Sequence, residues 1–322
     1  MKAIFNPLTS LFTSKFSPFV LSDLRANIGT STRATVTDTS RSLAENLKLT
    51  GPALLSYPDV LQKTVQIVTS IITKKHPCQE DMALEEEADL SDIETTEFDW
   101  LVVDSAMDVI SGMAVALGPS FAELWKIFEK QVLRYASSGE SLERASACGV
   151  LAETITGMGE GVTPFTGSMM QVLLKRLGDE DAQTKSNAAY AVGRLVEKSN
   201  DDATVTKAYP QILTRLEPLF SIMEARCRDN AAGCISRLIL KHRNNVPVAE
   251  VLPALVRSGV LPLKEDYEEN EPVWKMIVQL CKFRWSLCHM RDVLISVRRQ
   301  MGRQDCPGAY AAAGAYYGLD AW

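Results

Sequence analysis

The chain has 322 residues, more than a single hydrophobic core usually serves, so we expect either two domains or an array of repeats. Its 34 basic residues stand against 40 acidic ones, and the net charge of −6 disfavours nucleic-acid binding, which depends on neutralising phosphates. Apolar residues make up 46% of the chain, as in an ordinary soluble protein, but no uninterrupted apolar run approaches the roughly 18–20 residues that span a bilayer. The composition thus predicts neither a nucleic-acid nor a membrane partner.

Residues 1–50 are rich in Ser and Thr and contain no acid before Asp23, which gives them a faint likeness to a transit peptide. Pro7 and Pro18 would interrupt the amphipathic helix that such a peptide needs. We interpret this segment as the edge of a truncated repeat, or as partly disordered.

Residues 79–97, "QEDMALEEEADLSDIETTE", carry nine carboxylates and no basic residue. A charge run of this size is usually a solvated loop, and we expect an acidic loop here. Its functional interpretation is a mobile segment whose field attracts basic partners.

Three segments show an apolar stripe at three- and four-residue intervals, the helical period, and they cover residues 120–136, 165–179 and 205–220. Between them lie further apolar stretches related by steps of 41–43 residues, which contain Ala106, Ala147, Ala188, Ala231 and Trp274. Strand signals are absent. The pattern predicts an all-α fold over residues 51–283: a HEAT-repeat (armadillo-like) α-solenoid, a right-handed superhelix of about five antiparallel helix pairs.

The turn between paired helices carries the HEAT pattern. Gly178 ends one helix, and Asp179 and Asp181 are placed to cap the next. A basic residue follows early in the second helix, and we expect this position to ladder between neighbouring repeats. It is occupied in three successive repeats by Arg144, Lys185 and Arg228.

Two stretches 43 residues apart echo each other: "TKSNAAYAVGRL" at 184–195 and "CRDNAAGCISRL" at 227–238. Asn187 and Tyr190 share a helix face with Arg194, and we expect that face to be exposed. Asn230 recurs at the place of Asn187. The two asparagines either bind an extended peptide or cap and ladder the helices, and Tyr190 could add a cation–π contact worth roughly 0.5–2 kcal/mol.

Arg194 and Arg237 would repel a basic ligand, so we expect each to pair with an acid of an adjacent repeat. The stretch "KEDYEENEP" at 264–272 supplies acids. The helix dipole accounts for one or two of them, and the rest could recognise a lysine ammonium. These acids are Glu265, Asp266, Glu268, Glu269 and Glu271.

Catalytic chemistry has no recognisable basis in the sequence. His76, His242 and His289 have no carboxylate or cysteine at metal-ligand spacing, and neither a phosphate loop nor a serine elbow is present. We therefore predict no enzyme activity, no metal site and no cofactor. Seven scattered cysteines, an odd number, indicate a reducing cytosolic or nuclear compartment.

The segments "DEDAQTKSNAAYAVGRL", "RCRDNAAGCISRLI" and "VLPLKEDYEENEPVWKMIVQL" resemble the carboxy-terminal repeats of the karyopherin-β (importin-β) family, in particular its importin-four members of the fungal type. "EFDWLVVDSAMDVISGMAVALG" and "SFAELWKIFEKQVLRY" resemble the repeats before them, so the resemblance covers roughly residues 50–282. Residues 284–322 do not continue the pattern, and we expect a poorly ordered tail.

The resemblance implies a nuclear import receptor, cytoplasmic and nuclear, that binds lysine-rich segments of histones or ribosomal proteins on its concave face. It transfers lysine binding onto Glu268 and Glu269, with Asn230 beside them. The small GTPase Ran is implied as a partner of the full-length receptor, although its main binding repeats are not expected in this chain, and nucleoporins are further implied partners. The whole candidate cargo site is Asn187, Tyr190, Asn230, Glu265, Asp266, Glu268 and Glu269. The alternative function is a structural HEAT scaffold that joins folded proteins.

Overall fold

The structure is a computed structural model, and it describes residues 32–54, 58–79, 92–257 and 267–282. Within these ranges the secondary structure is helical, without a strand, which confirms the all-α prediction. Most of the expected acidic loop, Glu265 and Asp266, and the expected disordered tail at 284–322 lie outside the described residues.

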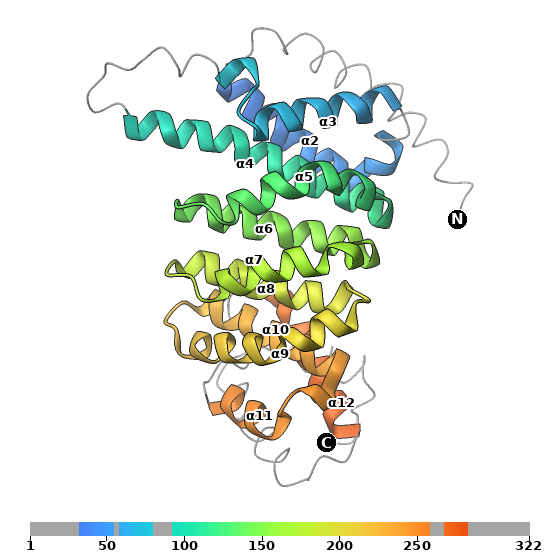
Figure 1. The fold of residues 1–322 in the computed structure, drawn as a ribbon, viewed down its shortest axis with the longest axis vertical. Helices are drawn as coiled ribbons and strands as arrows, with labels where there is room; N and C mark the ends of the chain where they lie inside the picture. Colours follow the sequence, from blue (N-terminus) through green and yellow to red (C-terminus); the bar gives the residue numbers. More distant parts are fainter. Residues whose placement is uncertain (1–31, 55–57, 80–91, 258–266, 283–322) are drawn as a thin grey trace, which may run out of the picture. The chain divides into compact units, whose positions relative to one another are not determined.

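Along the chain, α-helices alternate with short 3-10 helices at several of the turns (Figure 1). The α-helices are α2 (Arg33–Leu54), α3 (Pro58–Ile72), α4 (Asp92–Leu117), α5 (Ala122–Tyr135), α6 (Ser141–Met158), α7 (Thr166–Leu177), α8 (Ala182–Lys198), α9 (Asp202–Leu216), α10 (Ala225–His242), α11 (Val248–Arg257) and α12 (Asn270–Lys282). Short 3-10 helices are η2 (Gly118–Phe121), η3 (Gly159–Phe165), η4 (Glu217–Ser221), η5 (Arg243–Asn245) and η6 (Tyr267–Glu269).

The three helices expected at 120–136, 165–179 and 205–220 are confirmed as α5, α7 and α9. The acidic loop was expected to extend to residue 97, but α4 begins at Asp92, so this boundary was wrong. α2 begins at Arg33, inside the segment 1–50 that was interpreted as the edge of a truncated repeat or as partly disordered.

The chain divides into two compact units, residues 1–165 with Lys198–Asn200 and residues 166–197 with those from Asp201 onward. In the first unit α2, α4 and α6 contact one another in series, while α3 packs on α4 and α5. In the second unit α7 packs on α9, and α10 packs on α12. We call the later member of each pair, that is α2, α4, α6, α8, α10 and α12, the second helix; within each unit these helices pack on one another and form a layer of their own.

Small residues permit the close approach of neighbouring second helices. A Cβ atom added to Gly193 of α8 would lie 3.0 Å from Cα of Cys234 in α10. Cys227 and Cys234 are buried and unbridged, and they contribute to the packing of α10. Burial raises the pKa of the Cys227 thiol to about 11, because an apolar environment disfavours the thiolate.

The turn before α8 has the predicted capping acids. Asp181 accepts hydrogen bonds from the backbone N–H and the hydroxyl of Thr184, both at 2.7 Å, and Asp179 accepts one from the N–H of Asp181 at 3.1 Å. The cap satisfies N–H groups that have no partner within the helix.

The basic residue early in the second helix contacts the turn that precedes that helix. Arg144 donates to the carbonyls of Ser138 and Gly139, at 3.2 and 2.6 Å. Arg228 does the same for Ile222 and Met223, at 2.6 and 2.8 Å. These contacts do not form the expected ladder between repeats. Each guanidinium instead binds the carbonyls of the turn that leads into its own helix.

Aromatic side chains fill the core of the first unit. Phe121, Phe128 and Trp125 are fully buried. The ring of Trp100 packs edge-on against that of Tyr135, with 5.3 Å between the ring centres. The segment Trp100–Tyr135 contains an 18-residue window with a mean hydropathy of 1.6, long and apolar enough to span a bilayer, but 67% of that window is buried inside the protein. Its apolar composition is explained by its place in the core.

Candidate functional site

Asn187 and Tyr190 lie on α8, one helical turn apart and both half-buried. Asn187 accepts a hydrogen bond at 2.9 Å from the side-chain amide of Gln183, on the preceding turn of the same helix. Its amide is thus oriented by a local contact. The side chain keeps part of its surface exposed, as the helical pattern predicts.

Asn230, the equivalent residue on α10, was expected to be exposed as well, and that expectation was wrong. Its side chain is only 3% exposed, and its Nδ2 donates to Oγ and to the backbone O of Ser186 on α8, at 3.0 and 3.3 Å. The contact joins two neighbouring second helices. Of the two interpretations of the repeated asparagine, the ladder describes Asn230, although its buried Oδ1 has no partner among the described residues.

Glu269 was expected to face a ligand, but it is only 1% exposed. Its carboxylate forms a two-point ion pair with the guanidinium of Arg237, in which Nη2 donates to Oε1 at 2.7 Å and Nη1 donates to Oε2. The expectation that Arg237 pairs with an acid of an adjacent repeat is confirmed. Burial lowers the pKa of Arg237, but the hydrogen bond and the charge of Glu269 outweigh burial, so that this pKa is raised overall.

Gly233 makes room for this pair. A Cβ atom at that position would lie 1.5 Å from Oε2 of Glu269, far inside van der Waals contact. The glycine that replaces Tyr190 one repeat later therefore has a steric purpose: it lets the chain at η6 reach the surface of α10.

Tyr190 lies near two guanidiniums. The Cζ atoms of Arg194 and Arg237 lie 5.7 and 5.8 Å from the centre of its ring, within range of cation–π attraction. Glu197 accepts from both arginines, at 2.9 Å from Arg194 and 3.1 Å from Arg237. Arg194 thus pairs with Glu197 on its own helix, at i+3, whereas an acid of an adjacent repeat was expected.

The resulting Arg237 network consists of Tyr190, Arg194, Glu197, Arg237 and Glu269, and its two arginines balance its two carboxylates. Sequence reasoning missed Glu197, although its spacing from Arg194 was a usable signal. Burial raises the pKa of the Tyr190 hydroxyl. The network is suited to hold α8, α10 and η6 together.

Two acids of the "KEDYEENEP" stretch remain on the surface. Glu268 is exposed, and Glu271 is exposed while paired at 2.7 Å with Lys275, one turn further along α12. Of the candidate residues, the structure therefore leaves Asn187, Tyr190 and Glu268 accessible, and it buries Asn230 and Glu269.

A second group of acids, not foreseen from the sequence, lies on the second helices of the first unit. Asp104 and Asp108 are one turn apart on α4, and their charges act on each other and on that of Glu153 in α6. Burial, followed by repulsion from Asp104 and Glu153, raises the pKa of Asp108 to about 6. Lys48 of α2 lies 3.0 Å from Glu153 and neutralises part of the charge. The signal in the sequence was two acids at i and i+4 within the largely apolar second half of α4.

Metal binding has no support in this part of the molecule. Across residues 32–54, 58–79, 92–257 and 267–282, no group of three His, Cys, Asp or Glu side chains is placed to hold a metal ion.

Comparison with known proteins identifies relatives for most of the chain. No family model matches it. It is 38% identical over 225 residues to the probable importin subunit beta-4 of Schizosaccharomyces pombe, a match that covers 68% of this chain. It is 29% identical over 240 residues, 74% of this chain, to importin-4 of Homo sapiens. The matched segment is 21% of each of these relatives, so the chain spans about a fifth of their length.

The fold is also found among solved structures. The crystal structure of Kap121p bound to Ste12p superposes with a TM-score of 0.65 and 15% sequence identity, covering 97% of this chain and 30% of that one. This similarity shows a HEAT-repeat α-solenoid, in agreement with the 41–43-residue period and the paired helices. The chain therefore belongs to the karyopherin-β family, as a HEAT-repeat segment similar to importin-4.

Proposed function

We propose that this chain is a segment of a nuclear import receptor whose second helices bind lysine-rich segments of basic protein cargo, with histones and ribosomal proteins as the expected class. The observation that carries the proposal is the 38% identity to an importin subunit over two thirds of the chain. For the whole receptor we further propose Ran and nucleoporins as partners, and a cytoplasmic and nuclear location.

Three accessible side chains of the second unit support a basic ligand. In the second unit Glu268 is exposed, and Asn187 and Tyr190 are half-buried. A lysine ammonium near Glu268 would gain a charge-assisted hydrogen bond, and the amide of Asn187 could hydrogen-bond a peptide backbone. Glu265 and Asp266, outside the described residues, stay a prediction.

In the proposed site Asn230 and Glu269 act through their neighbours. Asn230 joins α10 to α8, and Glu269 neutralises Arg237, which would otherwise repel a lysine. Their role is to position the surface.

The acids of the first unit support the same ligand class for a physical reason. Asp104, Asp108 and Glu153 repel one another, which the raised pKa of Asp108 reflects. A bound ammonium relieves that repulsion, so a basic segment gains binding energy that a neutral one does not.

The test is binding of a fluorescent lysine-rich peptide, compared with the same peptide in which every lysine is glutamine, at several salt concentrations. We expect the lysine peptide to bind more tightly and to lose affinity with added salt, because exposed charge pairs are screened over about 8–10 Å near physiological ionic strength. If the two peptides bind equally, charge recognition fails and a scaffold function is favoured.

Two matched substitutions locate the site. We expect Glu268→Lys to weaken binding of the lysine peptide about three- to tenfold, because a favourable contact becomes repulsive. The control is Glu85→Lys, the same charge change in the acidic stretch at 79–97. Equal losses in both variants would contradict a local site and indicate a diffuse acidic attraction.

A further inference from the structure

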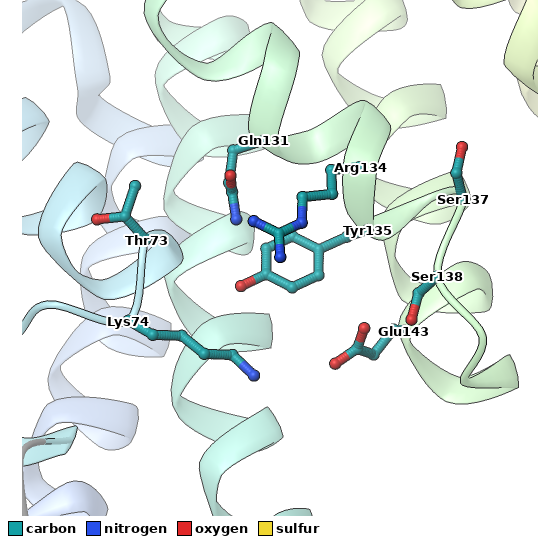
Figure 2. A pocket seen from close by; sticks show the side chains of 8 residues that line it. All are labelled: Thr73, Lys74, Gln131, Arg134, Tyr135, Ser137, Ser138 and Glu143. Carbon is teal, nitrogen blue, oxygen red and sulfur yellow. The ribbon is translucent and has the colours of Figure 1, made fainter. Parts of the chain in front are cut away.

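A pocket of about 360 Å³ lies in the first unit, where the end of α3 meets the end of α5 and the start of α6. Its volume is at the lower end of the range for small-molecule pockets, roughly 300–1,000 Å³, and is more than a single side chain needs. Figure 2 shows charged and hydroxyl side chains around the hollow, with the ring of Tyr135 behind the guanidinium of Arg134. The lining residues are Thr73, Lys74, Gln131, Arg134, Tyr135, Ser137, Ser138 and Glu143.

Lys74 has an unusual backbone. Its φ is +57°, and among the described residues no other non-glycine residue has a positive φ. The N–H of Lys75 bonds the carbonyl of Ser70 at 2.8 Å and that of Lys74 bonds Ile71 at 2.9 Å, the pattern that ends many helices with a glycine. A lysine is strained there, because its Cβ disfavours the left-handed conformation. Strain of this kind is informative where the side chain has a use.

Most neutral polar side chains of the pocket already form hydrogen bonds within the protein. The Tyr135 hydroxyl and the Gln131 amide both donate to the carbonyl of Ile72, at 2.8 and 2.9 Å. The Ser138 hydroxyl oxygen accepts from the N–H of Glu140 at 3.2 Å. These bonds hold the walls in place.

The charged side chains of the pocket, unlike most of its neutral ones, form no such bonds within the described part of the chain. No hydrogen bond or ion pair joins the side chains of Lys74, Arg134 or Glu143 to any other residue that the structure describes. Lys74 and Arg134 are exposed and Glu143 is half-buried, so a ligand can reach all three. Ammonium and guanidinium groups donate only, and together they outnumber the single carboxylate.

We propose that this pocket binds the carboxylate side chain of an acidic peptide segment from a protein partner, held between Lys74 and Arg134. Two cations and Glu143 leave one positive charge, which one carboxylate balances. A phosphate dianion would leave a negative charge beside Glu143, so the count favours Asp or Glu over a phosphorylated residue. Glu143 is placed to accept from a backbone N–H of the same segment (Figure 2). The site is independent of the cargo function proposed above, which concerns basic segments and other residues.

The probe is the peptide Gly-Gly-Glu-Gly-Gly-amide with fluorescein attached to its N-terminal amine; the full chain is titrated into it and binding is followed by fluorescence anisotropy. A version with Gln in place of Glu keeps the shape of the side chain but removes its charge. A version with phosphoserine in place of Glu carries a larger negative charge. We expect the Glu peptide to bind most tightly. Gln binding equally well, or phosphoserine binding more tightly than Glu, would overturn the proposal.

Matched double variants test the location. Lys74→Gln with Arg134→Gln should weaken binding of the Glu peptide about tenfold or more, because two charge-assisted contacts are lost. Lys75→Gln with Lys130→Gln makes the same charge change on exposed residues that do not line the pocket, and it should leave affinity within about twofold. Equal effects in both would reduce the result to the overall charge of the protein and overturn the proposal.

Lys74→Gly separates binding from folding. Glycine adopts a positive φ without strain, so the melting temperature should stay the same or rise while binding of the Glu peptide weakens, because one of the two charge-assisted contacts is lost. Retained binding in this variant overturns the assignment of Lys74. Arg134→Gln alone leaves the backbone at position 74 untouched, and it should also weaken binding of the Glu peptide. Unchanged affinity in this variant overturns the proposal even if the fold responds to changes at position 74.

Discussion

Two groups of charged side chains on the second helices differ in how their charges are compensated. In the second unit, the Arg237 network has two arginines and two carboxylates and is joined by hydrogen bonds between α8, α10 and η6. In the first unit, Asp104, Asp108 and Glu153 have Lys48 and Arg41 as nearby cations, one fewer than the carboxylates, and the pKa of Asp108 is still raised. The balanced group stabilises the packing, whereas the acidic one leaves negative charge that a basic ligand could neutralise.

The largest expected effect comes from breaking the balanced group. Glu269→Ala leaves the buried guanidinium of Arg237 without its two-point partner, and we expect the free energy of unfolding to fall by about 3–5 kcal/mol. Urea unfolding followed by circular dichroism measures it. Glu268→Ala, one residue away and exposed, is the control and should change stability by no more than about 0.5 kcal/mol. Similar values for both variants would mean that the buried pair adds nothing to the fold.

Gly233→Ala should disturb the same pair less severely. The new methyl group would overlap Oε2 of Glu269, so the carboxylate must move, and we expect a loss of about 1–3 kcal/mol. The diagnostic measurement is a double-mutant cycle. In the Glu269→Ala background the cost of Gly233→Ala should largely disappear, because the group that clashes is gone. Additive effects would show that the glycine serves another purpose.

The smallest effect comes from relieving the acidic group. The pKa of Asp108 is about 6 in the folded protein against 3.8 ordinarily, so the folded state holds the proton more tightly. This contribution to stability is complete below pH 4 and is lost as pH rises through about 6. Asp108→Asn removes that titration, and at pH 7 we expect it to stabilise the protein by about 1 kcal/mol, a value reduced from the full shift because solvent screens a partly exposed carboxyl.

Denaturation curves at pH 4 and pH 7 check the sign. Wild type should lose more stability than Asp108→Asn between these values. Asp38→Asn, an exposed change on α2, should retain the wild-type difference. If Asp108→Asn has the same pH dependence as wild type, the repulsion from Asp104 and Glu153 does not act on the folded state as described.

The sequence predicted the candidate site only in part. It indicated that Arg237 needs an acid from an adjacent repeat, and Glu269 is that acid. It placed Asn187 and Asn230 on the same face, since the helical period is the same for both, yet only Asn230 is buried. Periodicity describes one helix at a time, and the burial of an equivalent residue depends on which neighbour covers it.

The sequence by itself determined the repeat: the 41–43-residue step, the apolar stripes, the alanines and the acids that cap α8 all follow from local periodicity and turn chemistry. The tertiary structure alone decided which carboxylates are buried and paired, and which remain accessible. Glu269 meets Arg237 across 32 residues of chain because Gly233 leaves it room, while Glu268, its neighbour in sequence, is exposed. Such pairings depend on contacts between helices far apart in sequence, which no local pattern encodes.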